Sequence, residues 1–379
     1  MTIASDTADG TAHRDRRGGG RRRRLGAAAF VIAGLLAWTC RPAFARGECG
    51  LSCCIGSAGP SGVTLAQNFG LSVQYEYMKM GTIKHGTSSV GPNEALDELR
   101  SPGKPYAVPL DMTMQKISLI GAYTITERWQ ILGILPYVIN DMDMRMRVPT
   151  SMHMARSGAS PAMDMDGFMD MDHSMDRVDG VGDFALLAFY NAFTDAPIRP
   201  TQRLTLGVGL QTPTGRNEVK TPSGNFVHAM MQPGTGSWDP LFLVNYMRAF
   251  YPLVLQANFF YHLTTEGDTG YEFGDQLAFD LIARYQVWDY VNLGFETNFI
   301  YAGRDTDHDR RYSHPETSMV DNPANTGITT LALAPSVQVK LPRTGGSLDF
   351  KYQVPVFQDA NGYQLVLDWR ILAGVVWNF

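Results

Sequence analysis

The residues with the clearest chemical potential lie between positions 142 and 175, where ten methionines and two histidines occur. Several methionines form Met-x-Met pairs, and each histidine stands between two methionines. Thioether sulfur is a soft ligand that selects Cu(I), and imidazole suits copper in either oxidation state. The stretch therefore predicts binding of Cu(I), Cu(II) or Ag(I), while nothing in the sequence indicates a required cofactor. The candidate ligands are Met142, Met144, Met146, Met152, His153, Met154, Met163, Met165, Met169, Met171, His173 and Met175.

The same stretch has a second interpretation, as an acidic loop without a ligand role. Residues 141–183 hold nine acidic side chains against four arginines. No helical or strand period gives the methionines of "MDMDGFMDMDHSMD" (163–176) an apolar face of their own, which predicts an exposed loop over 141–181.

The metal-binding interpretation has further support, because the phrase "MDHSMD" resembles Met/His/Asp repeats of bacterial copper-resistance proteins. Because the spacing is redundant, a metal would exchange among many ligands rather than occupy one fixed site.

Three cysteines form a second constellation, in the segment 46–68. The default prediction is one disulfide, Cys49 with Cys53 or with Cys54, and one free thiol. The alternative is a periplasmic thiolate site that hands on metal, or an attachment point for a partner.

The first 45 residues have the pattern of a cleaved signal peptide. A basic stretch, 21–24, precedes an apolar run over 25–38 and a small-x-small cleavage site, Ala43-Phe44-Ala45. The alternative is an uncleaved anchor. After residue 45 the net charge is about −10, which argues against a nucleic-acid partner and favours cations or neutral solutes.

The last residues, "YQLVLDWRILAGVVWNF" (363–379), alternate between apolar and polar types. This period of two is that of a strand, because successive side chains of a strand point to opposite faces. The alternation predicts that Tyr363, Leu365 and Leu367 lie on one lipid-facing side together with the apolar residues up to Phe379. A terminal aromatic residue is typical of barrels recognised by the outer-membrane assembly machinery, so Phe379 predicts that partner. An ordinary terminal strand of a soluble sandwich is the alternative.

The same alternation recurs twelve times between residues 69 and 379, and the connecting segments are alternately short and mostly long. This pattern is typical of short periplasmic turns and longer extracellular loops. The sequence therefore predicts an all-β, transmembrane, antiparallel up-and-down β-barrel of about twelve strands over 69–379, in contact with lipid in the outer membrane of a Gram-negative cell. Both termini would then be periplasmic.

Charged residues occupy the strand faces opposite the apolar stripes, and these faces would line the lumen. They either pair with one another and fill the barrel, or form a polar path with a selectivity constriction. The predicted lumen residues are Glu76, Lys116, Asp280, Arg284, Glu296, Asp349, Lys351, Asp368 and Arg370.

The sequence does not favour an enzyme. His262 lies on a lumen-facing position, but no serine nucleophile motif occurs near a strand end. The loop "DTDHDRRYSHPE" (305–316) contains two histidines without regular metal-ligand spacing.

Four phrases resemble the family of outer-membrane transporters named after the meta-pathway of phenol degradation. They are "YTITERWQILGILPYV" (123–138), "GVGDFALLAFY" (180–190), "GVGLQTPTG" (207–215) and "QPGTGSWDPLFLVNY" (232–246), within a match over roughly 70–346. The resemblance implies a barrel related to porins for hydrophobic compounds, which passes small molecules. The methionine-rich stretch is not part of that pattern.

These observations together predict an outer-membrane channel or transporter for a small solute, with an extracellular soft-metal-binding loop. The alternative is a copper or silver tolerance protein in which the barrel mainly anchors a metal-sequestering loop.

Overall fold

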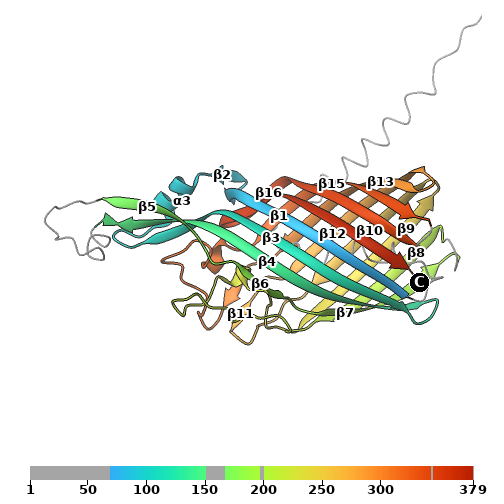
Figure 1. Ribbon diagram of the computed structural model, residues 1–379, viewed down its shortest axis with the longest axis horizontal. Coiled ribbons are helices and arrows are strands. Elements are labelled where there is room, and N and C mark those ends of the chain that lie inside the picture. Colours follow the sequence, from blue (N-terminus) through green and yellow to red (C-terminus); the bar gives the residue numbers. More distant parts are fainter. Residues whose placement is uncertain (1–68, 151–166, 197–199, 343–344, 379) are drawn as a thin grey trace, which may run out of the picture. The chain divides into compact units, whose positions relative to one another are not determined.

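A computed structural model describes residues 69–150, 167–196, 200–342 and 345–378 of the chain (Figure 1). The signal peptide 1–45, the cysteine segment 46–68 and Phe379 lie outside the described residues. Within the described part, no helix is both long and apolar enough to span a membrane.

One antiparallel sheet of fourteen strands forms the structure, and its order is β16-β15-β13-β12-β10-β9-β8-β7-β4-β3-β1-β2, with β5 and β6 paired to β4. A further pairing joins β16 to β1 and closes the sheet into a barrel. Closure removes the unpaired edges that lipid cannot satisfy. The strands are β1 (Phe69–Gly86), β2 (Ser88–Val90), β3 (Tyr106–Thr124), β4 (Trp129–Pro149), β5 (Phe168–Ser174), β6 (Val178–Val181), β7 (Ala185–Thr194), β8 (Gln202–Gln211), β9 (Asp239–Phe250), β10 (Leu253–His262), β12 (Gln276–Trp288), β13 (Val291–Ala302), β15 (Ile328–Leu341) and β16 (Gly346–Asn378).

The predicted twelve wall segments are recovered because β16 crosses the wall twice. Its first half pairs with β15 as far as Ala360, and its second half pairs with β1 from Tyr363 onward. A hydrogen bond from Arg370 to Gln353 joins the two halves. The reversal falls at Asn361-Gly362, where Gly362 has φ +70°, and Asn-Gly is the preferred pair for a two-residue hairpin turn.

Alternation of side chains along the strands positions the two faces of the wall. On β1, Ser72, Gln74 and Glu76 are buried inside, whereas Val73 and Tyr75 are exposed outside. An apolar outer face and a polar inner face are what a lipid-embedded barrel requires. Near the short turns the outer face carries a group of exposed aromatic residues, as at a membrane interface: Trp129, Phe193, Phe250, Tyr251, Tyr285, Trp288 and Tyr290.

The two ends of the barrel differ in their connections. At the short-turn end, which also holds the C-terminus, the links are as short as Tyr251-Pro252. At the long-loop end lie the helix α3 (Pro92–Leu99), the one-turn helices η1 (Ala229–Met231) and η2 (Pro323–Asn325), and the small sheet of β11 (Tyr271–Glu272) and β14 (Thr306–Asp307). In Figure 1 the long-loop end, with β5 and α3, is at the left.

The structure corrects the expectation of an irregular loop over 141–181. Residues 141–149 continue β4, β5 pairs with this continuation, and β6 pairs with β4 closer to the barrel. The physical reason is that the Met-Asp alternation is itself a strand period, with methionines on one face and charged residues on the other.

A second correction concerns the face of Tyr363, Leu365 and Leu367, which were expected to meet lipid. All three are buried in the core cluster of the barrel. Register shifts in the β1–β16 pairing lie between Lys79 and Met80 and between Met80 and Thr82. An inserted residue reverses the faces of everything beyond it, so the uninterrupted alternation of the sequence does not correspond to one face.

Candidate functional site

Charged side chains meet inside the barrel on its inner face. Glu76 on β1 is 1 % exposed and contacts both Lys116 Nζ at 2.6 Å and Arg370 Nη1 at 2.8 Å. Arg370 also bonds to Gln353, whose amide donates to Asn298 Oδ1 at 2.7 Å. Each of these three charges has an opposite charge as a partner, which is the arrangement that makes burial of charge tolerable.

Polar side chains that face one another on neighbouring strands continue this chain of contacts through six strands, from β13 to β7. Asn298 donates to Asp280 Oδ1 at 2.7 Å, Asn245 donates to Asn258 at 2.6 Å, and Thr205 donates to Asn191 at 2.7 Å. Register pairs Asp280 with Asn258 and Asn245 with Thr205. We call the whole set the polar belt; it consists of Lys116, Glu76, Arg370, Gln353, Asn298, Asp280, Asn258, Asn245, Thr205 and Asn191.

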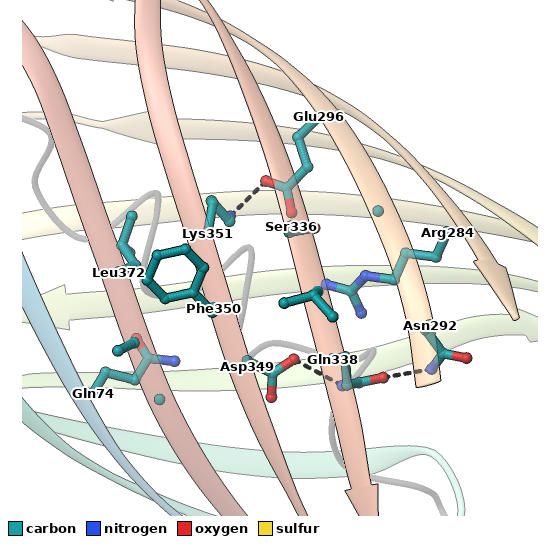
Figure 2. A pocket seen from close by; sticks show the side chains of 14 residues that line it. Gln74, Arg284, Asn292, Glu296, Ser336, Gln338, Asp349, Phe350, Lys351 and Leu372 are labelled. Atoms are coloured by element: carbon teal, nitrogen blue, oxygen red, sulfur yellow. Dashed lines mark hydrogen bonds and ion pairs between the residues drawn. The ribbon is translucent and has the colours of Figure 1, made fainter. Parts of the chain in front are cut away.

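A small cavity of about 30 Å³, which many polar side chains line (Figure 2), lies on the short-turn side of the charged part of the belt. Lys351 binds Glu296 at 2.5 Å on its wall. Gln338 donates to Asp349 Oδ1 at 2.9 Å and accepts from Asn292 at 2.8 Å. We call this space the short-turn cavity. Its lining is suited to small polar or charged species.

A second cavity of about 140 Å³ lies on the long-loop side of the belt, with Lys116 in its lining. We call it the long-loop cavity. Its walls combine apolar side chains, among them Met78, Ile134 and Phe273, with the polar side chains of Asn140, Asp183 and Gln211. On β1 the two cavities lie on either side of Glu76, because Gln74 lines the short-turn cavity and Met78 lines the long-loop cavity.

The connection between β8 and β9 covers the long-loop cavity and is anchored on Asp183. The Asp183 carboxylate accepts from Gly215 N at 2.9 Å, Thr235 N at 2.7 Å and Thr235 Oγ1 at 2.8 Å. Burial raises the pKa of this carboxyl above its usual range, although these hydrogen bonds oppose the shift. Farther along the same connection, Met231 O accepts from the Asn140 amide at 3.1 Å.

Close backbone approach at this anchor explains two glycines. A Cβ on Gly234 would lie 2.5–2.7 Å from backbone atoms of Gly215, and a Cβ on Gly215 would lie 3.0 Å from Cα of Gly182. The phrases "GVGD", "PTG" and "PGTGSWD" from the sequence therefore meet at one junction. They anchor a cavity wall.

The methionines and histidine of β4 and β5 share one face of their ladder. Met144 lies opposite His173, and Met146 lies opposite Met171. Directly opposite residues of an antiparallel pair point to the same face, with Cβ atoms about 5 Å apart. We call Met144, Met146, Met171 and His173 the outer quartet. Met144 is buried, whereas Met171 and His173 are exposed.

The opposite face of this ladder is held by ion pairs. Arg145 binds Asp172 and Arg147 binds Asp170, each through two hydrogen bonds of 2.6–2.8 Å. Arg147 also binds Asp97 of α3. Arg147 therefore connects β4, β5 and the helix.

Among the predicted metal ligands, Met142, Met144, Met146, Met169, Met171, His173 and Met175 are described, and those at 152–165 lie outside the described residues. Met142 is 2 % exposed and packs in the core cluster rather than in an open loop. Over the described ranges, no group of three or more His, Cys, Asp or Glu side chains is arranged to hold a metal. Any soft-metal site would therefore depend on thioethers.

Eight of the nine predicted lumen residues lie in the belt or line the short-turn cavity. Asp368 differs: it lies at the bulge and accepts a hydrogen bond from Thr82 Oγ1 at 2.7 Å. The sequence reasoning missed Met78, Met80, Met112 and Met114. Their Met-x-Met spacing within strands was the available signal.

Comparison with known proteins agrees with this architecture. The sequence matches the family described as "Putative MetA-pathway of phenol degradation" over residues 119–365. No curated protein sequence matches the chain.

Among solved structures, an outer-membrane channel from Pseudomonas putida F1 is similar at TM-score 0.50 and 12% identity, over 85% of this chain and 98% of the other. A FadL homologue from Pseudomonas aeruginosa gives TM-score 0.40 at 10% identity, over 83% and 90%. The toluene transporter TodX from P. putida gives 0.38 at 9% identity, over 85% and 90%. At such identities the likeness concerns the fold, and it rests on the first of the three. The family match covers more than half of the sequence, so the chain belongs to this phenol-degradation family and is an outer-membrane β-barrel rather than an enzyme.

Proposed function

We propose that the protein is an outer-membrane channel for a small solute, which passes the two cavities in series. The observation that carries this proposal is the ion-paired belt with a cavity on each side of it. A barrel that served only as an anchor would need neither a cavity on each side of the belt nor a looped wall held by Asp183. The similar solved structures include proteins described as an outer-membrane channel and a toluene transporter.

The proposal includes an orientation and an assembly partner. With the short turns and the C-terminus in the periplasm, the long-loop cavity faces the exterior. Phe379 would then end the strand that the barrel-assembly machinery recognises. Protease added to intact cells should cleave the long-loop end and leave an epitope at the C-terminus protected; the reverse pattern would contradict this orientation.

Soft-metal binding is the second component of the proposed function. It is supported by the shared face of the outer quartet, which places three thioethers and one imidazole within side-chain reach of one another. Such a donor set fits Cu(I) and Ag(I). In contrast to the expected fluxional loop, this ladder would offer one defined site.

Planar-bilayer recording tests the channel directly. Purified protein should show discrete conductance steps, and these should persist when the segment 151–166 is replaced by a short Gly-Ser linker. Complete absence of steps from folded, reconstituted protein would favour the alternative, a metal-sequestering protein whose barrel is an anchor.

Titration with Ag(I) against a chelator of known affinity tests the metal component. The variant Met144→Leu/Met146→Leu/Met171→Leu/His173→Leu should lose one bound Ag(I), because leucine retains the bulk and removes the ligand. Met247→Leu is the matched control, since Met247 is buried on β9 outside this cluster. Unchanged stoichiometry in the quadruple variant would refute the outer quartet as a site.

A further inference from the structure

Methionines are concentrated at the long-loop end of the barrel interior. Eleven of the nineteen methionines in the chain lie in, or pack against, one core cluster. On β9 and β10 the same cluster uses ordinary hydrophobic residues, Leu241, Leu243 and Phe260. Methionine can fill irregular space in a core, but that role does not require a common face and register.

Four of these methionines form a second arrangement like the outer quartet. On the inner face of β1 and β3, Met78 lies opposite Met114 and Met80 lies opposite Met112. The Cβ atoms of these four methionines are about 5 Å apart between the two strands and about 7 Å apart along each strand. At these distances the sulfur atoms of all four flexible side chains can contact one metal ion. We call these residues the inner quartet.

Register connects the two quartets. Met142 lies opposite Met112 on β3, and on its own strand it is two residues from Met144, on the same face. On the other side of β4, Met175 N donates to Met142 O at 2.9 Å. Thioethers therefore follow one another from the exposed His173, through Met144 and Met142, to the inner quartet.

The inner quartet also reaches the lumen. Met78 and Met114 line the long-loop cavity, together with Met230 from the β8–β9 connection. Two residues farther along each strand stand Glu76 and Lys116 of the belt. An ion released from the inner quartet would enter the long-loop cavity next to the ion-paired part of the belt.

We propose that a soft monovalent metal ion, Cu(I) or Ag(I), is a cargo of this barrel and passes from the outer to the inner quartet on its way into the long-loop cavity. This inference rests on the proposed channel function and names its substrate class. Neutral thioethers suit such transfer, because they bind soft ions without the strong charge attraction that would hold an ion at one position. Several weak sites in series are what conduction requires.

Binding and flux of Ag(I) test the inference with the full-length protein. The number of Ag(I) ions that the wild type binds in the chelator titration is the reference. The variant Met78→Leu/Met80→Leu/Met112→Leu/Met114→Leu should bind one ion fewer, because leucine keeps the volume of the core and removes its sulfur. Met247→Leu should bind as many ions as the wild type. Unchanged stoichiometry in the inner-quartet variant would overturn the inner site.

Flux into vesicles separates this inference from the channel itself. In proteoliposomes carrying a trapped Ag(I)-sensitive dye, the inner-quartet variant should admit Ag(I) about tenfold more slowly than wild type, a barrier difference of about 1.4 kcal/mol. Its K⁺ conductance should be unchanged. Equal Ag(I) flux in both proteins would refute the cargo assignment and leave the channel standing, whereas wild type without any K⁺ conductance would refute the channel. Circular dichroism of the variant controls for folding.

Discussion

At the scale of single residues, Asp183, Gly215 and Gly234 bring the sequence motifs of the family together beside the lumen. The buried carboxylate collects two backbone N–H groups and one hydroxyl from the β8–β9 connection, and this connection contributes Met230 and Gln232 to the long-loop cavity. Sequence could identify the phrases. It could not show that they meet, because the contact joins segments separated by some fifty positions.

The close approach at Gly234 gives a prediction for stability. Gly234→Ala should lower the free energy of unfolding by about 2–4 kcal/mol, because the new Cβ overlaps the backbone of Gly215 and that backbone must shift. Gly121→Ala is the control, since a Cβ at Gly121 meets nothing within 4 Å. Urea unfolding in detergent micelles measures both, and equal stabilities would show that the junction is not tightly packed.

Methionine positions show what residue types alone could predict. The pairs Met78-x-Met80 and Met112-x-Met114 repeat the spacing of Met142-x-Met144, so the signal was present in the sequence. It was not recognised because each pair lies within a strand that hydrophobicity alone already explains. Register between strands decides which pairs become neighbours, and a single sequence does not contain register.

At the scale of elements, the ladder of β4 and β5 stands beyond the closed wall and needs its own stabilisation. Methionines pack on one face, and Arg145 and Arg147 bind Asp172 and Asp170 on the other. Taken alone, the alternation "MDMDH" indicates an exposed acidic loop, because charge next to methionine excludes a dry core. A strand with two different faces satisfies the same pattern.

Arg147 is the residue on which this ladder depends most. Arg147→Ala should increase amide exchange of β5 about fivefold, which corresponds to about 1 kcal/mol, because it removes contacts to both Asp170 and Asp97. The exposed arginine of the same segment, Arg177, provides the control variant Arg177→Ala. Hydrogen exchange with mass spectrometry reports both variants. Equal exchange of β5 in them would show that the ion pairs are dispensable.

The ladder should also depend on pH, in a known direction. Hydrogen bonds from Arg147 and Arg145 lower the pKa of Asp170 and Asp172 below the usual value of 3.8. A carboxyl with a lowered folded-state pKa contributes stability above its unfolded pKa, and that contribution is lost as the pH falls through the folded value. β5 should therefore stay protected down to pH 4 or so and loosen below it. Loosening between pH 7 and 5 would contradict this assignment.

The strands themselves were largely predictable, because lipid outside and polar groups inside impose a period of two. The failures occur where one residue is inserted. At the bulge beside Met80 the faces exchange, so Leu367 lies in the core and Asp368 bonds to Thr82 instead of joining the belt. A bulge cannot be located from the pattern of apolar and polar residues, because the inserted residue continues the alternation.

At the scale of the whole molecule, the closed wall, the belt and the two cavities bound the path that we propose for the solute. The wall could be inferred from alternation, loop lengths and the aromatic end of the chain. The pairing of Glu76 with both Lys116 and Arg370 could not, because it joins the first strand of the barrel to the last across the closure.

The central claim is that this ion-paired part of the belt limits passage between the cavities. The most direct measurement is the unit conductance of Glu76→Gln/Lys116→Gln/Arg370→Gln, which removes all three charges together. Lys79→Gln/Asp111→Asn is the matched control, because this ion pair also joins β1 to β3. Its two side chains are half-buried and lie on the opposite face of the wall from Glu76 and Lys116. The account predicts a unit conductance raised about two- to fivefold in the belt variant alone. Equal conductance in the belt variant, the control and wild type would contradict it.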